Sequence, residues 1–121
     1  MKSSNFRDLM VWQKAMDLTV EIYLLVKHLP KEENYALSDQ MRRAAVSVPS
    51  NIAEGHGRDS AKEFVRFLSM ARGSLRELST QLEICIRLQY LNESNTLTSN
   101  TLITEVDKML TSLATKLTTD N

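Results

Sequence analysis

Apolar residues recur every three or four positions over four long segments of this chain, and short polar turns separate the segments. Residues 8–29 carry two such stripes side by side, and weaker single stripes follow in residues 35–55, 60–90 and 96–117. Spacing of this kind is typical of helices that pack nearly parallel to one another. The pattern therefore predicts one all-α domain over residues 1–121, folded as an up-down-up-down antiparallel four-helix bundle.

The first helix is apolar over more of its surface than a bundle requires. Its first stripe is Leu9, Trp12, Met16, Thr19, Tyr23 and Val26, and its second is Val11, Ala15, Leu18, Ile22, Leu25 and Leu29. Together they cover an arc of about 200°, whereas an outer helix of a monomeric bundle needs little more than about 100°. We therefore expect a homo-oligomer, with Trp12, Tyr23, Asn51 and Glu54 as candidate interface residues.

The second helix contains an internal proline, Pro49. Proline removes one backbone hydrogen bond and clashes with the carbonyl four residues earlier, at a cost of about 3 kcal/mol. The sequence thus predicts a bend at Pro49, or two short helices that meet there. We expect the segment to end near Gly55 or Gly57, where glycine can adopt the left-handed conformation of a helix C-terminus. Ser60 and Glu63 match a capping box that starts the third helix.

The overall charge gives no general attraction to nucleic acid or to an anionic membrane, because fifteen basic residues balance fifteen acidic ones. Any electrostatic binding must come from a local arrangement. The longest apolar runs are too short for the roughly 20 residues of a membrane span. The single cysteine, Cys85, lies on the inward stripe of the third helix. One cysteine and no signal peptide at the N-terminus predict a cytoplasmic protein with Cys85 in its core.

Basic residues are concentrated in the middle of the chain. On a helical wheel, Lys62, Arg66, Arg72, Arg76 and Arg87 fall within an arc of about 120°, and further arginines lie on or just after the second helix. Guanidinium groups suit phosphate because the planar fork bonds two oxygens at once. The candidate nucleic-acid-binding residues are Arg42, Arg43, Arg58, Lys62, Arg66, Arg72 and Arg76, with Gly73 allowing close approach.

Other uses of these arginines remain open at this stage. Nearby carboxylates such as Asp59, Glu63 and Glu83 favour a salt-bridged, solvated surface, and arginines are also common at subunit interfaces. No aromatic residue interleaves with the arginines of the wheel, which argues against a platform on which single-stranded bases stack.

Signals for catalysis are weak. A di-metal bundle needs Glu-x-x-His motifs on two helices, and this sequence has none. It also lacks a phosphate-binding glycine loop, a nucleophile elbow and zinc-ligand spacing. Glu54 beside His56 suggests a metal site or an acid–base pair, but a structural role for Glu54 is favoured. The sequence therefore predicts no catalytic residue, no metal site and no cofactor.

Several segments resemble the bacterial four-helix-bundle family that is associated with intervening sequences of 23S ribosomal RNA genes. The resemblance runs through Leu9-x-Val11-Trp12-Gln13-x-Ala15, Gln40-x-Arg42-Arg43-Ala44, Ser47-x-Pro49-x-Asn51-Ile52-Ala53-Glu54-Gly55 and Gly73-Ser74-Leu75-x-Glu77-Leu78-x-Thr80-Gln81. It implies a four-helix bundle that assembles as a homopentamer, and it implies no established biochemical activity. A related branch, the accessory protein of diversity-generating retroelements, is thought to bind nucleic acid but is strongly basic, whereas this chain is neutral.

These observations lead to two functional hypotheses. In the first, a non-enzymatic ring of about five chains binds structured RNA or DNA through a basic face that is repeated around the ring, which adds avidity. In the second, the oligomer is a scaffold that recruits a protein partner, and its arginines make subunit contacts.

Overall fold

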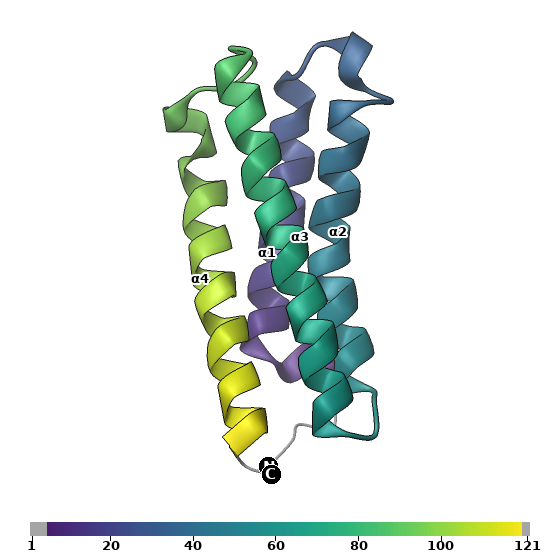
Figure 1. Ribbon diagram of the computed structural model, residues 1–121. Coiled ribbons are helices and arrows are strands. Elements are labelled where there is room, and N and C mark those ends of the chain that lie inside the picture. The colour runs from purple at the N-terminus through teal and green to yellow at the C-terminus, as the bar shows by residue number, and fades with distance from the viewer. Residues whose placement is uncertain (1–4, 120–121) are drawn as a thin grey trace.

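The computed structural model describes residues 5–119 and confirms the all-α four-helix bundle (Figure 1). Helix α1 spans Met10–Leu25, α2 spans Leu37–His56, α3 spans Ala61–Arg87 and α4 spans Glu93–Thr119. Three short 3-10 turns, η1 (Phe6–Asp8), η2 (Val26–His28) and η3 (Lys31–Glu33), flank α1 and precede α2. Helix α1 packs against α2 and α4, and α3 packs against the same two helices. The pairs α1/α3 and α2/α4 are therefore the diagonals of the bundle.

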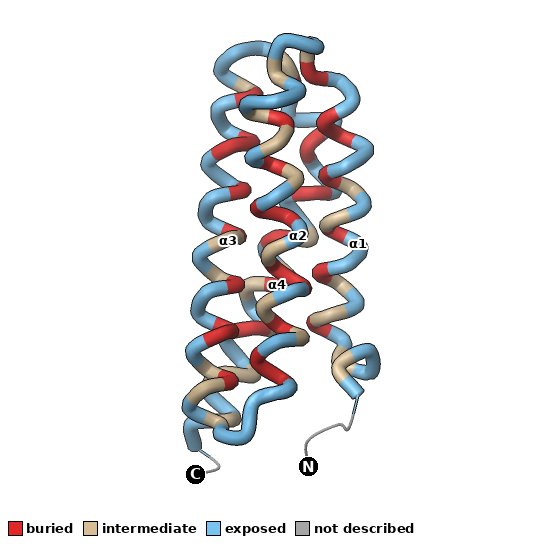
Figure 2. Tube along the Cα trace, turned by 90° about the vertical axis from the view of Figure 1, so that its right-hand side faces the viewer, coloured by how far each residue is buried: buried red, intermediate tan, exposed pale blue. Residues whose placement is uncertain are grey.

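The core runs along the whole bundle axis (Figure 2). From α1 it takes the second of the two predicted stripes, including Ala15, Leu18 and Ile22, which are fully buried. The first stripe faces outward at Met16 and Tyr23, which are exposed. The bundle therefore uses only part of the apolar surface of α1, and the remainder is available to solvent or to a partner.

Helix ends differ from the sequence expectation by a few residues. The α-helix of α1 stops at Leu25 and tightens into η2, rather than continuing to residue 29. Helix α4 begins at Glu93, three residues earlier than expected, because Asn92 and Asn95 cap it reciprocally. The side-chain oxygen of each accepts the backbone N–H of the other, both at 2.9 Å. This asparagine pair lacks the serine or threonine and the glutamate or glutamine of a capping box, so the capping-box pattern did not indicate the start of α4.

The start of α3 confirms the serine half of the predicted capping box, since the Ser60 side chain accepts the Glu63 backbone N–H at 3.1 Å. The Glu63 carboxylate bonds instead to Arg66. The expected left-handed glycine at the end of α2 is wrong. Gly57 is right-handed (φ −80°), because its N–H bonds to Ala53 and Glu54 in a tightened last turn. Within residues 5–119 the left-handed residue is Gln89 (φ 65°), just after α3. There the Tyr90 N–H reaches the Cys85 carbonyl at 2.9 Å, and this bond closes a Schellman motif.

Helix α2 continues as one α-helix through Pro49, so the alternative of two short helices is wrong, and the bend stays a prediction. Proline has no N–H, and the carbonyl four residues earlier, that of Ala45, loses its helical donor. The hydroxyl of Thr19 on α1 lies 3.1 Å from this carbonyl and 2.9 Å from the carbonyl of Ala15. A side chain of α1 thus supplies the donor that proline removes from α2.

Gly55 allows the end of α2 to approach the start of α3. A Cβ atom at this position would lie 2.7 Å from the Phe67 Cβ and 3.0 Å from the Phe64 ring. Gly73 contrasts with it, because a Cβ there would meet no other atom within 4 Å. Gly55 is thus required by packing within the chain, whereas Gly73 is not.

We predict that Thr19→Val destabilises the protein by about 1–2 kcal/mol, since an unpaired carbonyl at a helix interface carries a desolvation cost. In a Pro49→Ala background the new N–H of residue 49 can bond to Ala45, so the same substitution should cost less than half as much. Urea unfolding of the four proteins gives the coupling energy, with Thr19→Ser as the control that keeps a hydroxyl. Equal losses in both backgrounds would contradict the role assigned to Thr19.

We expect opposite effects from alanine at two glycines. Gly55→Ala should destabilise by about 1–3 kcal/mol, because overpacking forces α2 and α3 apart. Gly73→Ala should stabilise by about 0.5–1 kcal/mol, because it removes backbone freedom from a helix interior without a clash. Thermal and urea unfolding of both variants check this, and a Gly55→Ala protein as stable as the parent would refute the close contact.

Candidate functional site

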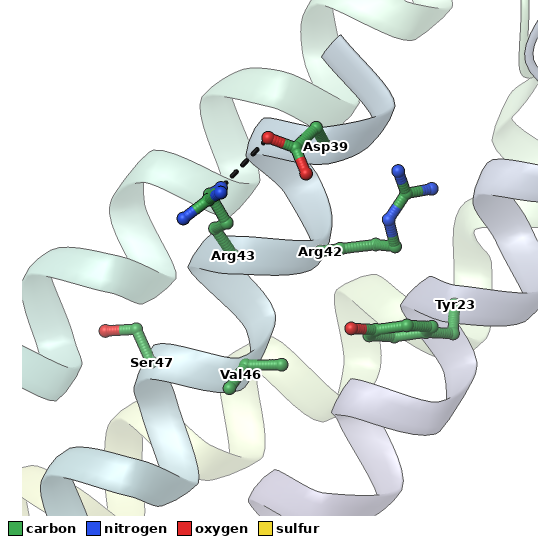
Figure 3. A pocket seen from close by; sticks show the side chains of 6 residues that line it. All are labelled: Tyr23, Asp39, Arg42, Arg43, Val46 and Ser47. Carbon is green, nitrogen blue, oxygen red and sulfur yellow. Dashed lines mark hydrogen bonds and ion pairs between the residues drawn. The ribbon is translucent and has the colours of Figure 1, made fainter. Parts of the chain in front are cut away.

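A groove between α1 and α2 runs along one side of the bundle. Its middle part has a volume of about 290 Å³ and is mainly apolar, with Trp12 and Met16 on one wall and Val46 and Pro49 on the other. Val46 also lines the adjoining hollow, which lies beside Tyr23 (Figure 3). Ser50 and Ala53 connect the middle part to a third hollow, next to Phe6 and Gly57. These hollows form one continuous surface, called the groove below.

The outward face of α1 extends the groove with exposed apolar side chains. We call Met16, Val20, Tyr23 and Leu24 the α1 patch. Val20 and Leu24 are 57% and 51% exposed, respectively. In monomeric proteins large apolar side chains are mostly buried, and the exposed ones are usually scattered singly. Contiguous exposed apolar surface with a polar rim is typical of a protein–protein interface.

The predicted interface residues lie in two places. Trp12 and Tyr23 line the groove, and Glu54 stands at its end with its carboxylate 2.9 Å from Arg58. Asn51 lies elsewhere. Its amide donates to the Ser47 carbonyl at 2.9 Å, and the Ser47 hydroxyl is 2.6 Å from that of Ser74 on α3. Asn51 therefore belongs to a polar seam between α2 and α3.

The rim of the groove carries charges that are already paired. In Figure 3 the Arg43 side chain bonds to Asp39 on the same helix, at 2.9 Å, while Arg42 extends from α2 into the space beside Tyr23. The bond with Asp39 raises the pKa of Arg43. Arg42 donates to the backbone carbonyl of Asn34 at 2.9 Å. Neither arginine projects from the surface as an unengaged cation.

Most of the other predicted phosphate-binding arginines are also ion-paired. Arg66 bonds to Glu63 at 3.2 Å, which lowers the pKa of Glu63. Arg72 crosses to α4, where its Nε lies 3.0 Å from the Asp107 carboxylate. Carboxylates of α3 itself and of α4 therefore hold part of the basic arc on α3, which does not form one open basic face.

One expectation about aromatic residues is wrong. The guanidinium groups of Arg58 and Arg66 both lie over the Phe67 ring, at 4.8 and 4.7 Å from its centre. Sequence reasoning missed this because Arg58 precedes α3 and folds back onto it. Phe67 is buried by these contacts, so its faces are already occupied and the ring is not an open stacking platform.

Three of the predicted basic residues, Arg42, Lys62 and Arg76, have no ion pair among residues 5–119, although Arg42 donates to the Asn34 carbonyl. Sequence reasoning missed Lys108 of α4, which also has no ion pair in the described residues and lines the same hollow between α3 and α4 as Arg76. Lys108 lies on the fourth helix, outside the family motifs and outside the cluster of basic residues in the middle of the chain, so no sequence pattern indicated it.

The groups considered for chemistry are buried or scattered. Cys85 is fully buried with its sulfur 3.7 Å from that of Met41, and burial raises the pKa of this thiol to about 11. His56 packs edge-on against Phe64 in the interior. In the described part of the chain no three His, Cys, Asp or Glu side chains group closely enough to hold a metal ion. No helix in residues 5–119 has the length and hydropathy of a membrane span.

Comparison with known proteins gives a consistent result. The sequence model of the family "23S rRNA-intervening sequence protein" matches residues 7–112. The crystal structure of a protein of unknown function from the S23 ribosomal protein family of Bacteroides thetaiotaomicron has the same fold. Its TM-score is 0.77 at 26% identity, over 87% of this chain and 98% of that one. No curated protein matches this chain.

Proposed function

The chain belongs to the 23S rRNA-intervening sequence protein family, and we propose that it is a non-enzymatic module that assembles with copies of itself through the groove and the α1 patch. The observation that carries this proposal is the surplus apolar face of α1. Its inner stripe fills the core while Val20, Tyr23 and Leu24 are left exposed. Removal of such side chains from water is the main favourable contribution to most protein–protein contacts.

A second copy of the chain is the occupant that fits this surface. The rim of the groove carries both signs of charge, in the pairs Asp39–Arg43 and Glu54–Arg58. Because the chain has no net charge, a second copy would not be repelled electrostatically from this rim. The homopentamer implied by the family resemblance requires such a contact. Because the arginines of the rim already have partners within the chain, assembly would rest mainly on apolar burial.

A closed ring of identical subunits needs two different surfaces that fit each other. The second surface that we propose is the α3 stripe, formed by Met70, Ile84 and Leu88, which are 46%, 40% and 51% exposed. Met70 lies one turn before Ser74, whose hydroxyl contacts α2, so the stripe borders α2 from the side away from α1. Contact between the groove of one copy and the α3 stripe of the next would repeat around a ring.

Binding of a nucleic-acid backbone is the second candidate function. It is favoured by cations that have no ion pair within residues 5–119, among them Lys62, Arg76 and Lys108. The name of the family also connects it to ribosomal RNA genes. Because the chain is neutral overall, this binding would depend on a few local phosphate contacts for each subunit.

We expect Met16→Glu and Ile84→Glu each to dissociate the oligomer, because a charge buried in an apolar contact loses its hydration. Leu97→Glu is the matched control. Leu97 is 66% exposed on α4, outside both surfaces, and its replacement should leave the assembly intact. Light scattering coupled to size-exclusion chromatography gives the masses, and circular dichroism checks the fold. A monomeric parent protein, or equal masses for all three variants, would overturn the proposal.

For the second function, we expect the protein to bind duplex DNA or structured RNA with an affinity that falls steeply as salt rises. The logarithm of the binding constant for duplex DNA should fall by about 0.9 per logarithm of salt for each phosphate neutralised. Fluorescence anisotropy across a salt series measures this slope. Absence of binding at low salt would refute nucleic-acid binding and leave self-assembly as the function.

A further inference from the structure

A hollow of about 220 Å³ lies between α3 and α4, on the side of the bundle away from the groove. Side chains from both helices line it. Leu75 and Ile103, both buried, form its apolar floor, and Arg76, Ser79, Thr104, Asp107 and Lys108 form its polar walls. We call it the α3–α4 hollow.

The charge balance inside the α3–α4 hollow is positive. Its carboxylate, Asp107, accepts a bond from Arg72 at 3.0 Å, so Arg72 balances that negative charge. The two remaining ionised groups are Arg76 on α3 and Lys108 on α4, and neither has an ion pair in the part of the chain that the structure describes. Two cations from different helices therefore line one hollow, beside a carboxylate whose charge is balanced by its ion pair with Arg72.

This arrangement differs from that of four other arginines on the surface. Each of these arginines bonds to a carboxylate three or four residues earlier in the sequence; they are Arg43, Arg58, Arg66 and Arg87. Arg76 has Arg72 four residues before it and Thr80 four residues after it, so its own helix offers no carboxylate at those positions. Like charges at that spacing are mildly unfavourable in a helix, and an external anion would relieve the repulsion.

The polar groups of the hollow suit an oxyanion. A guanidinium presents a planar fork of donors, an ammonium adds a compact positive charge, and the Ser79 hydroxyl is a further donor. The Thr104 hydroxyl already donates to the Asn100 carbonyl at 3.1 Å, so Thr104 contributes no donor. The apolar floor strengthens charge interactions above it, because it excludes water from one side.

We propose that the α3–α4 hollow binds a phosphate group through Arg76, Lys108 and Ser79, with the Arg72–Asp107 pair holding the two helices in position. The group can belong to a nucleic-acid backbone or to a free phosphate compound. With nucleic acid as its source, the inference rests on the second proposed function. It relocates that function from the predicted face of α2 and α3 to the border of α3 and α4.

The test compares two double variants with equal changes of charge. Arg76→Gln with Lys108→Gln removes the cations of the hollow, whereas Lys31→Gln with Lys116→Gln removes two exposed cations that line neither the hollow nor the groove. Arg72 is left unchanged, because its loss would leave Asp107 unpaired beside the hollow. The probes are a labelled RNA hairpin, followed by anisotropy, and pyrophosphate, followed by the shift in melting temperature.

We expect the hollow variant to bind the hairpin about tenfold more weakly, with a salt slope smaller by about 1, because one neutralised phosphate is lost. The control should lose less than threefold. Pyrophosphate should raise the melting temperature of the parent and of the control, but not of the hollow variant.

The possible failures are distinguishable. If the parent protein binds pyrophosphate but not the hairpin, the phosphate site stands and nucleic-acid binding fails. If the parent binds the hairpin and both double variants weaken it equally, nucleic-acid binding stands and the hollow is not its site. If the parent binds neither probe, both ideas are overturned. Circular dichroism shows whether each variant is folded.

Discussion

The carbonyl of Ala45 has no donor within its own helix, because Pro49 lacks the N–H that would reach it, and the hydroxyl of Thr19 on α1 lies 3.1 Å away. A buried carbonyl without a partner carries a cost comparable to that of a lost hydrogen bond. Proline thus converts a local defect of α2 into a connection with α1. The register of these two helices is restricted by this connection, and Pro49 and Thr19 both line the groove between them.

The same pair of helices shows why α1 has two apolar stripes. One stripe fills the core with Ala15, Leu18 and Ile22, and the other lies beside the groove, where Met16 and Tyr23 are exposed. A bundle of four helices buries one face of each helix, so α1 has more apolar surface than the fold can use. The constraint that holds α1 against α2 therefore also fixes the surface that a second copy would cover.

Ion pairing within the chain decides where an anion could bind. Exposed pairs such as Arg87–Glu83 and Arg43–Asp39 contribute little to stability, because solvent screens them. Their larger effect is on anion binding, because the two opposite charges of each pair largely cancel in the electrostatic potential that an approaching anion would feel. The cations without such partners then dominate the local potential. Arg76 and Lys108 matter for this reason, although the arginines are more numerous on α2 and the start of α3.

The sequence predicted the four helices because apolar periodicity over twenty or more residues is a strong signal, and it predicted the Ser60 cap because that signal is local. It could not predict the division of the basic residues. A helical wheel treats α3 as isolated, whereas Arg66 lies over Phe67 together with Arg58, and Arg72 pairs with Asp107, thirty-five residues away. Contacts between segments so far apart depend on the fold, so the candidate site was predicted only in part.

Assembly and phosphate binding would use different sides of the bundle. Helices α1 and α3 are diagonal, as are α2 and α4, so the groove between α1 and α2 lies opposite the α3–α4 hollow. Contacts made through the groove leave that hollow uncovered, and the α3 stripe borders α2 rather than α4. A ring built in this way would present one hollow for each subunit. A site with two cations binds one phosphate weakly, but several such sites on one rigid ring engage an extended polyanion together, with an effective concentration in the millimolar range. Neutral overall charge is then compatible with specific binding to phosphate, because avidity replaces the general attraction that a strongly basic protein would have.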